Sequence, residues 1–362
     1  MPIQILMKDS LNNIHPSFKL NGISYSAVEL KEMAYSLVKE GLDHEIDIGD
    51  FLLDWLFNSR TLLVSTSGST GDPKIIELQK IHMQNSAKET AKFLGLQPGN
   101  TALLCLPVKY IAGKMMLVRA MVLGLEVYYN VPSSSPLKGI GKKFDFCAMV
   151  PMQLKNSLGE IERISKVIVG GAPVPESLKA MIREKSNLIY ETFGMTETIT
   201  HIALRKLSGG MAEKNFKILN NIVIATDNRN CLLVKAPELG AKEVQTNDVI
   251  TMDSATEFRW MGRLDNIINS GGIKLHPEKI EEKLDSLIDG QFFMAGVPDE
   301  SLGEKLVLIL EGNQDVNKIS TMIDRLEDLQ KFEVPKAIYS LPDFVMTSSG
   351  KINRKETIKG IR

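Results

Sequence analysis

Residues 65–74, Ser-Thr-Ser-Gly-Ser-Thr-Gly-Asp-Pro-Lys, combine hydroxyl side chains, two glycines and a lysine. Phosphate oxygens accept hydrogen bonds from all of these groups, and glycine lets the backbone approach a ligand closely. Apolar runs on both sides, Leu62–Val64 and Ile75–Ile76, predict a strand, a tight polar turn and a second strand. The segment therefore indicates a polyphosphate-binding loop, although a solvated turn is the commoner fate of this composition.

A Walker-type phosphate loop is excluded. That pattern needs Gly-Lys-Ser/Thr at the start of a helix, whereas Lys74 follows Pro73 here.

Three later segments also combine glycines with charged or hydroxyl side chains. They are Glu-Thr-Phe-Gly-Met-Thr-Glu at 191–197, Gly-Arg-Leu-Asp-Asn-Ile-Ile at 262–268 with Gly271-Gly272, and Ser349-Gly350-Lys351 with Arg354. Together with Thr66–Lys74, and in this order, they resemble the motifs of the acyl-adenylate-forming family. The resemblance extends over most of the chain. It implies an AMP-forming acid–CoA ligase that uses ATP, Mg²⁺ and CoA.

The resemblance also implies roles for these residues. Glu197 would hold Mg²⁺, Thr196 would donate to the α-phosphate, and Lys351 would bridge the substrate carboxylate and the α-phosphate. A Thr-Glu pair alone would more often be a helix start. The residues implied to bind the ATP phosphates are Thr66, Ser67, Gly68, Ser69, Thr70, Gly71 and Lys74.

Adenine and ribose contacts are implied for Gly171, Ala172, Pro173, Phe193, Gly194, Asp248 and Arg263. Phe193 replaces the family's usual tyrosine, and Asn247 replaces the glycine of Thr-Gly-Asp. Without the resemblance, the glycine segment would equally be a strand-to-helix turn, and Asn247-Asp248 an Asx turn.

Asp265 matches the family's hinge, about which the C-terminal domain rotates between two half-reactions. Gly271 and Gly272 would lie on the face used for thioester formation, or simply form a turn.

The acyl pocket is implied near Lys109, Tyr110 and Lys114, with Tyr110 in place of a family histidine. Within the family, residues 150–154, Val-Pro-Met-Gln-Leu, resemble the members that activate o-succinylbenzoate for menaquinone biosynthesis, although a strand end before a helix would read the same. Because that substrate is a dicarboxylate, a second cation should face it, and Lys109, Lys114 and Arg119 are the candidates. A ligase for another aromatic or aliphatic acid, a carrier-protein acceptor and a non-catalytic nucleotide-binding protein remain alternatives.

Composition favours a globular protein of two or three domains, with 362 residues, 43% hydrophobic and 24% charged. The net charge of −1 gives no reason to expect a nucleic-acid or membrane partner. Cys105, Cys147 and Cys231 are expected to be buried free thiols, and no metal-ligand spacing is present. We see no signal peptide or spanning segment, so we expect a cytoplasmic location.

Alternating apolar runs and helical patterns after residue 62 predict an α/β fold with a largely parallel sheet. Expected strands are 101–106, 127–129, 144–150 and 167–169, and expected helices are 80–93, 111–123, 152–158 and 176–184. We predict a multi-sheet N-terminal AMP-binding domain over 1–262, with a helical cap at its start and a β-rich subdomain over about 202–260. A small mobile α+β domain would follow over 263–362, with helix 277–287 and strand 305–310. The region before the phosphate loop is short for the family, and a homodimer contact is one way to close the acyl pocket.

Overall fold

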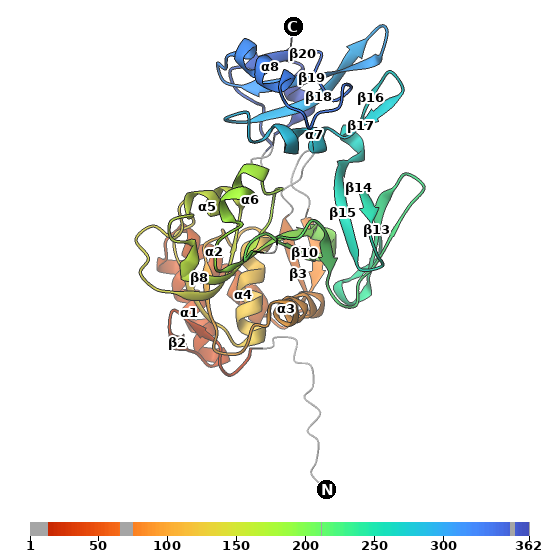
Figure 1. Cartoon of the computed structure of the whole chain (residues 1–362). Coiled ribbons are helices and arrows are strands. Elements are labelled where there is room, and N and C mark those ends of the chain that lie inside the picture. The colour runs from red at the N-terminus through yellow and green to blue at the C-terminus, as the bar shows by residue number, and fades with distance from the viewer. Residues whose placement is uncertain (1–13, 66–74, 211, 348–351, 362) are drawn as a thin grey trace.

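The computed structural model describes residues 14–65, 75–210, 212–347 and 352–361. Within these ranges the strands form a 13-stranded mixed sheet, a five-stranded sheet near the C-terminus and a two-stranded hairpin (Figure 1). The order in the large sheet is β12-β13-β14-β15-β11-β10-β9-β8-β7-β5-β6-β1-β2. The expected α/β fold class is confirmed.

The parallel half of the large sheet holds five strands, of which the sequence pattern predicted the first four in chain order but not the fifth. They are β5 (Thr101–Leu104), β6 (Glu126–Tyr129), β7 (Phe144–Met149), β8 (Ile164–Val169) and β9 (Leu188–Gly194). All their mutual pairings are parallel. Parallel strands are covered on both faces, and alternate residues here enter two different cores. Ala102 and Leu104 join one, and Leu103 and Cys105 the other.

Helices cover both faces of this half. The first core receives α3 (Lys80–Leu94) and α4 (Ile111–Leu123), and the second receives α5 (Pro151–Asn156) and α6 (Glu176–Ile182). Gly95 and Gly124 end α3 and α4 in the left-handed conformation that glycine adopts without strain.

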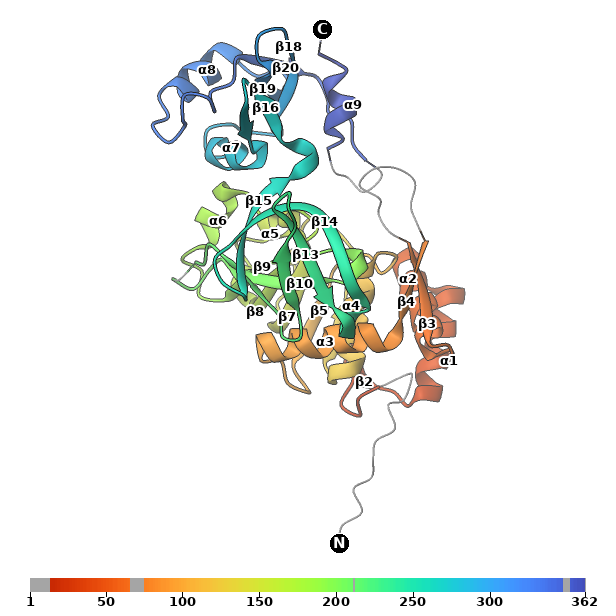
Figure 2. The same ribbon diagram turned by 90° about the vertical axis from the view of Figure 1, so that its right-hand side faces the viewer.

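The helical cap expected at the start is a pair of helices, α1 (Ala27–Glu40) and α2 (Asp43–Leu56), which lie side by side (Figure 2). The expected capping box of Ser26 and Glu29 is present. Strands β1 (Lys19–Leu20) and β2 (Ile23–Ser24) precede the helices and extend the sheet beyond β6. The fully buried Trp55 joins the cap to the first core.

The β-rich region expected over about 202–260 is continuous with the large sheet, which the sequence did not predict. Its strands are β10 (His201–Lys206), β11 (Phe216–Ile218), β12 (Val223–Thr226), β13 (Cys231–Ala236), β14 (Ala241–Met252) and β15 (Glu257–Arg263). Strand β11 pairs with both β10 and β15, so it joins the two parts.

The C-terminal region has its own five-stranded sheet and two cores. Its strands are β16 (Ile268–Ser270), β17 (Ile273–Leu275), β18 (Phe292–Asp299), β19 (Gly303–Glu311) and β20 (Ala337–Leu341). Its helices are α7 (Pro277–Leu284), α8 (Val316–Asp324) and α9 (Arg354–Ile358). Helix α7 ends at Leu284, three residues before the expected Leu287. The carboxylate of the next residue, Asp285, accepts from the Ser177 amide of α6 at 2.6 Å.

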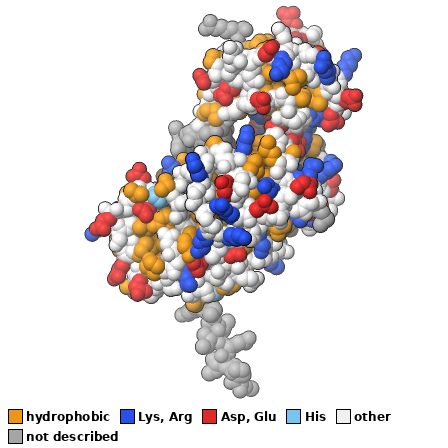
Figure 3. Space-filling model, turned by 60° about the vertical axis from the view of Figure 1, so that its left-hand side comes forward, with side chains coloured by type: hydrophobic (Ala, Val, Ile, Leu, Met, Phe, Trp, Pro, Cys, Tyr) orange, Lys and Arg blue, Asp and Glu red, His pale blue; other side chains and the backbone are white. Residues whose placement is uncertain are grey.

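All three cysteines are buried and free, as expected. On the face in Figure 3, acidic and basic side chains are intermixed, in keeping with the net charge of −1. No helix in the described part of the chain has the length and apolarity to cross a bilayer.

Lys80 fastens the start of α3 to the end of α2. Its ammonium is fully buried, donates to the carbonyls of Trp55 and Phe57 at 2.7 Å each, and lies 5.8 Å from the centre of the Trp55 ring. A cation suits carbonyls at a helix C-terminus.

We expect Lys80→Met to lower the free energy of unfolding by about 2–3 kcal/mol, because two carbonyls lose their donor. Urea denaturation measures the change, and Lys88→Met, an exposed position of the same helix, is the control. Equal effects of the two substitutions would contradict this role.

Candidate active site

Among the predicted nucleotide-binding side chains that the structure describes, Asp248 of β14 is the most buried, with 8% of its surface exposed. Its Oδ1 accepts from Trp260 Nε1 at 3.0 Å and its Oδ2 from Arg263 Nη1 at 3.3 Å. Burial raises the pKa of Asp248, and Arg263 and Trp260 oppose that rise. Each oxygen keeps a further lone pair, so the carboxylate can accept from a sugar diol. The Asx-turn alternative is wrong, because both Asn247 and Asp248 lie within the strand.

Residues 170–173 connect β8 to α6, as both the family resemblance and the turn alternative required. A Cβ on Gly170 would come within 2.4 Å of Thr192 Oγ1, and Gly171 has φ of +88°. These two positions therefore need glycine. Gly171, Ala172 and Pro173 are exposed, so the turn offers backbone surface to a flat ligand.

Phe193 near the end of β9 belongs to an aromatic cluster. Its ring centre lies 5.7 Å from that of Phe216 and 5.2 Å from that of Phe258. The ring is partly buried, so its position is fixed by packing.

Thr196 and Glu197 lie in a single 3₁₀ turn, Thr196–Thr198, which connects β9 to β10. The helix-start alternative is wrong, because Met195 is the cap residue and no α-helix follows. The loop is strained at Ile199, a buried residue with φ 68° and ψ −62°, spanned by a hydrogen bond from the Thr200 amide to the Thr198 carbonyl at 2.8 Å. This is a γ-turn that a β-branched residue rarely adopts, and such strain concentrates at functional sites.

Glu197 is exposed, and none of the described side chains or amides donates to it. No group of three or more metal-ligating side chains occurs in the described ranges. One free carboxylate still fits Mg²⁺, which is often held by one or two carboxylates together with substrate phosphates and water.

Arg119 of α4 is buried in the first core with 2% of its surface exposed. Among the described residues no carboxylate lies within 4.0 Å of its guanidinium, Nε has no partner, and Nη1 meets only Met116 Sδ at 4.0 Å. Burial lowers the pKa of Arg119 to about 10, so the group stays charged at neutral pH.

His201 opens β10 beside Arg119. Burial, and then the charge of Arg119, hold the pKa of His201 well below its ordinary value. Its Nε2 lies 3.2 Å from Thr90 Oγ1, and that hydroxyl donates to the Ser86 carbonyl. The histidine therefore donates through Nε2 and is neutral. Arg119 is thus close to the start of β10, the strand that follows the loop carrying Thr196 and Glu197.

The other predicted acyl-pocket residues lie elsewhere on and before α4. Lys109 and Tyr110 are exposed, and the Lys109 ammonium lies 5.2 Å from the Tyr110 ring centre. Lys114 faces α2, with its ammonium 5.0 Å from the centre of the Phe51 ring and near Asp54. Of the three candidate cations, Arg119 is the buried one without a carboxylate among the described residues.

Asp265 lies in the 3₁₀ turn Leu264–Asn266 that connects β15 to the C-terminal sheet. Gly271 and Gly272, with φ of 59° and 81°, form the turn between β16 and β17. The simple-turn reading is therefore correct for the backbone, and the thioester role stays a prediction.

The phosphate loop, Thr66–Lys74, and Lys351 lie outside the described residues. The flanking strands β3 (Thr61–Ser65) and β4 (Ile75–Gln79) pair antiparallel, as the apolar runs predicted.

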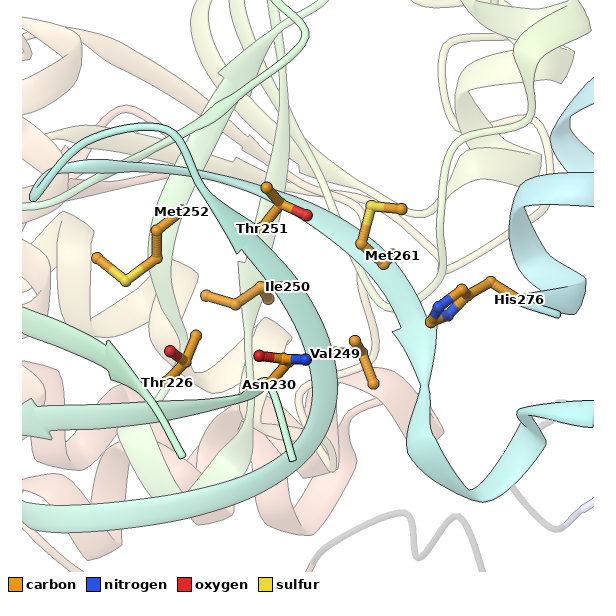
Figure 4. Close-up of a pocket in the computed structure, with 8 residues that line it drawn as sticks. All are labelled: Thr226, Asn230, Val249, Ile250, Thr251, Met252, Met261 and His276. Atoms are coloured by element: carbon orange, nitrogen blue, oxygen red, sulfur yellow. The ribbon is translucent and has the colours of Figure 1, made fainter. Parts of the chain in front are cut away.

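A pocket of about 370 Å³ lies beside the predicted site. Figure 4 shows its lining from β12, β14 and β15, from Asn230 in the turn between β12 and β13, and from His276 before α7. Burial lowers the pKa of His276. None of the predicted site residues lines this pocket.

Sequence reasoning missed Trp260, whose indole binds Asp248. Ile250 pairs directly with Trp260 in the β14–β15 ladder, so Asp248 and Trp260 are diagonal neighbours on one face. A predicted hairpin with this register would have indicated the contact.

The chain matches the family model described as AMP-binding enzyme over residues 59–219. It is 36% identical to the acyl-CoA synthetase (AMP-forming)/AMP-acid ligase II-like protein from Dyadobacter fermentans DSM 18053, with a TM-score of 0.62. The match covers 92% of this chain and 98% of that one. The chain therefore belongs to the AMP-binding, adenylate-forming enzymes, and it is an AMP-forming acid–CoA ligase that uses ATP and CoA.

The chain is also similar to enzymes that are named for their action on succinylbenzoate. The 2-succinylbenzoate–CoA ligase of Enterococcus faecalis is 24% identical over 80% of this chain and 67% of its own length. The o-succinylbenzoate coenzyme A synthetase (MenE) from Bacillus subtilis, solved with ATP and magnesium ion, is 22% identical with a TM-score of 0.70. That match covers 82% of this chain and 69% of the other. At 22% identity, the likeness to the Bacillus subtilis structure shows a shared fold.

The close approach of Gly194 to the following strand gives a test of the β9–β10 loop. A Cβ there would lie 2.2 Å from the Thr200 carbonyl oxygen and 2.4 Å from His201 Cα, both backbone atoms. We expect Gly194→Ala to lower the free energy of unfolding by about 1–3 kcal/mol and to weaken ATP binding.

Urea denaturation measures the change in the free energy of unfolding, and calorimetric titration measures the affinity for ATP. Gly141→Ala, where a Cβ has open space, is the control. Unchanged ATP binding in Gly194→Ala would contradict a role for this loop.

Proposed function

We propose that this ligase converts o-succinylbenzoate, ATP and CoA into o-succinylbenzoyl-CoA, AMP and diphosphate, a step of menaquinone biosynthesis. The names of the relatives support this substrate. The observation that carries the proposal within the chain is Arg119, a buried cation without an anion among the described residues.

In the first half-reaction, a carboxylate oxygen of the acid attacks the α-phosphorus of ATP, and the bond to the bridging oxygen breaks to release diphosphate. In the second, the CoA sulfur attacks the acyl carbon, AMP leaves, and the thiol proton passes to solvent. Both steps concentrate negative charge, so positioned donors and cations stabilise them.

The sequence-predicted residues supply these groups in our proposal. Asp248 would accept from the ribose hydroxyls, while Arg263 holds that carboxylate and reaches the nucleotide. The turn at 170–173 and Phe193 would flank the adenine. Glu197 would hold Mg²⁺, which would offset charge on the phosphates. Thr196, Thr66–Lys74 and Lys351 would contact the phosphates, with Lys351 also at the attacking carboxylate.

We further propose that residues 263–362 move as one domain about Asp265. Such rotation would present Lys351 for the first half-reaction, and Gly271 and Gly272 for the second. A homodimer, a cytoplasmic location, and the absence of nucleic-acid and membrane partners stay predictions from the sequence.

Arg119 distinguishes a dicarboxylate from a monocarboxylate substrate. A buried unpaired charge is costly, and the cost falls when an anion pairs with it. The second carboxylate of o-succinylbenzoate would supply that anion. A monocarboxylate would leave the guanidinium unpaired.

The substrate is tested by measuring diphosphate release from ATP with o-succinylbenzoate and with a panel of benzoates and fatty acids, each with and without CoA. We expect release only with o-succinylbenzoate, and a CoA thioester by mass spectrometry. Release with another acid alone would keep the ligase chemistry and overturn the proposed substrate.

Arg119→Met is expected to have opposite effects on stability and on substrate use. Without ligand it should raise the free energy of unfolding by about 1–4 kcal/mol, because an unpaired buried charge is removed. It should lower kcat/KM for o-succinylbenzoate by about 10- to 100-fold, the worth of a charge-assisted pair. Lys114→Met, on the same helix but facing α2, is the control. A destabilised Arg119→Met protein with unchanged kcat/KM would show that Arg119 is structural.

A further inference from the structure

The predicted hinge residue, Asp265, is held by side chains from two strands of the large sheet. Asn247 of β14 donates its Nδ2 to both carboxylate oxygens of Asp265, at 3.2 Å each. Arg263 at the end of β15 donates its Nη2 to Asp265 Oδ2 at 3.4 Å. The turn that leads into the C-terminal domain is therefore attached to β14 through an amide as well as to β15 through the chain.

Arg229 fixes the orientation of the Asn247 amide. Its Nη1 donates to Asn247 Oδ1 at 3.3 Å, and its Nη2 donates to the Thr246 carbonyl at 3.3 Å. The guanidinium is held in turn by Asp227, with Nε 2.8 Å from Oδ2. The amide oxygen therefore faces a cation, and the amide nitrogen faces the Asp265 carboxylate.

The next residue along the chain is attached to the other domain. Asn266 Nδ2 donates to Glu278 Oε1 of α7 at 2.5 Å. Asp265 is thus bound to the large sheet and Asn266 to the small domain. A rotation about the backbone between them requires the Asn247–Asp265 contact to break or to follow the moving domain.

In the Thr-Gly-Asp motif that this segment resembles, glycine stands at the position of Asn247, and glycine has no side chain with which to hold the hinge. The departure from Thr-Gly-Asp therefore has a structural consequence at the hinge that is separate from the nucleotide contacts of Asp248.

We propose that Asn247, oriented by Arg229, is a positioning residue that favours the described domain orientation and so sets the relative rates of the two half-reactions. This rests on the proposed hinge role of Asp265. The Asp265 side chain is 48% exposed, so water competes for its oxygens and the bias is modest. The bond between Asp285 and the Ser177 amide supports the same orientation independently.

The test compares Asn247→Gly and Asn247→Asp with the unaltered enzyme. Glycine removes the contact, and aspartate places a second carboxylate opposite Asp265. We expect the ratio of the adenylation rate to the thioester-forming rate to change about three- to tenfold in Asn247→Gly, and further in the same direction in Asn247→Asp. Adenylation is followed by diphosphate release, and thioester formation by single turnover from supplied acyl-adenylate.

A second measurement does not depend on the activity. The Ile267 amide donates to the Leu264 carbonyl at 3.2 Å within the hinge turn. Hydrogen exchange of the peptide over residues 263–268 should be faster in both variants than in the unaltered chain. Asn221→Gly removes a comparable amide–carboxylate bond, to Glu238 at 3.0 Å, and should change neither quantity.

Faster hinge exchange with an unchanged rate ratio would show that Asn247 holds the turn without setting the half-reactions, and would overturn the proposal. Unchanged exchange and an unchanged ratio would overturn it as well. Failure of the unaltered enzyme with o-succinylbenzoate would reject only the proposed substrate, since the exchange comparison and the ratio with the true acid remain measurable.

Discussion

Strands β5 to β9 run parallel, whereas β10 pairs antiparallel with β9, so the chain reverses direction within residues 195–200. That reversal is short because His201 must pair with Gly194 at once. It forces Ile199 into a γ-turn and excludes a Cβ from Gly194. The same six residues include Thr196 and Glu197, so the strained loop fixes two proposed catalytic side chains at the edge of a rigid sheet.

Two buried charges of the large sheet and its helices, Glu191 and Arg119, show how the needs of folding differ from those of binding. Glu191 of β9 is buried but paired, with Arg205 Nη2 at 2.5 Å and an amide hydrogen bond from Val174 at 2.9 Å. It therefore anchors the adenine-side turn to the strand that leads into the loop. Arg119, equally buried, has no such carboxylate among the described residues. A fold optimised only for stability would pair or remove that charge. The unpaired Arg119 is therefore an argument for a substrate with an anionic group that pairs with it.

The sequence predicted those parts of the structure that depend on local pattern. The helix at 111–123 and the capping box at Ser26 follow from apolar period and cap chemistry, and both are confirmed. The join of β11 to β15 was not predictable, because pairing of distant strands leaves no local signal. The same holds for the candidate site: motifs identified Asp248 and Arg263, but their contact with Trp260 and the contact of Asn247 with Asp265 depend on strand register. The sequence could not show which of Lys109, Lys114 and Arg119 faces the acid. The packing of α4 decides which side chain faces α2 and which faces the core.

The join at β11 also determines where the enzyme can move. Phe216 of β11 pairs with Phe258 of β15, and both rings contact Phe193 of β9. Strand β15, which ends at Arg263, is thus hydrogen-bonded to β11 and β14. Its Phe258 ring also packs against Phe193 of β9, the strand that leads into the Thr196–Glu197 loop. A rotation that began before Arg263 would break this aromatic cluster and the β14–β15 ladder. One that begins at Asp265 would leave both intact and break side-chain contacts such as Asn247–Asp265 and Asp285 with the Ser177 amide. Because packed sheets resist deformation and exposed hydrogen bonds exchange readily with water, the least costly place for domain motion is the residue after β15 and its turn. In the proposed rotation, Asp248 would stay with the sheet while the C-terminal domain would reorient relative to it.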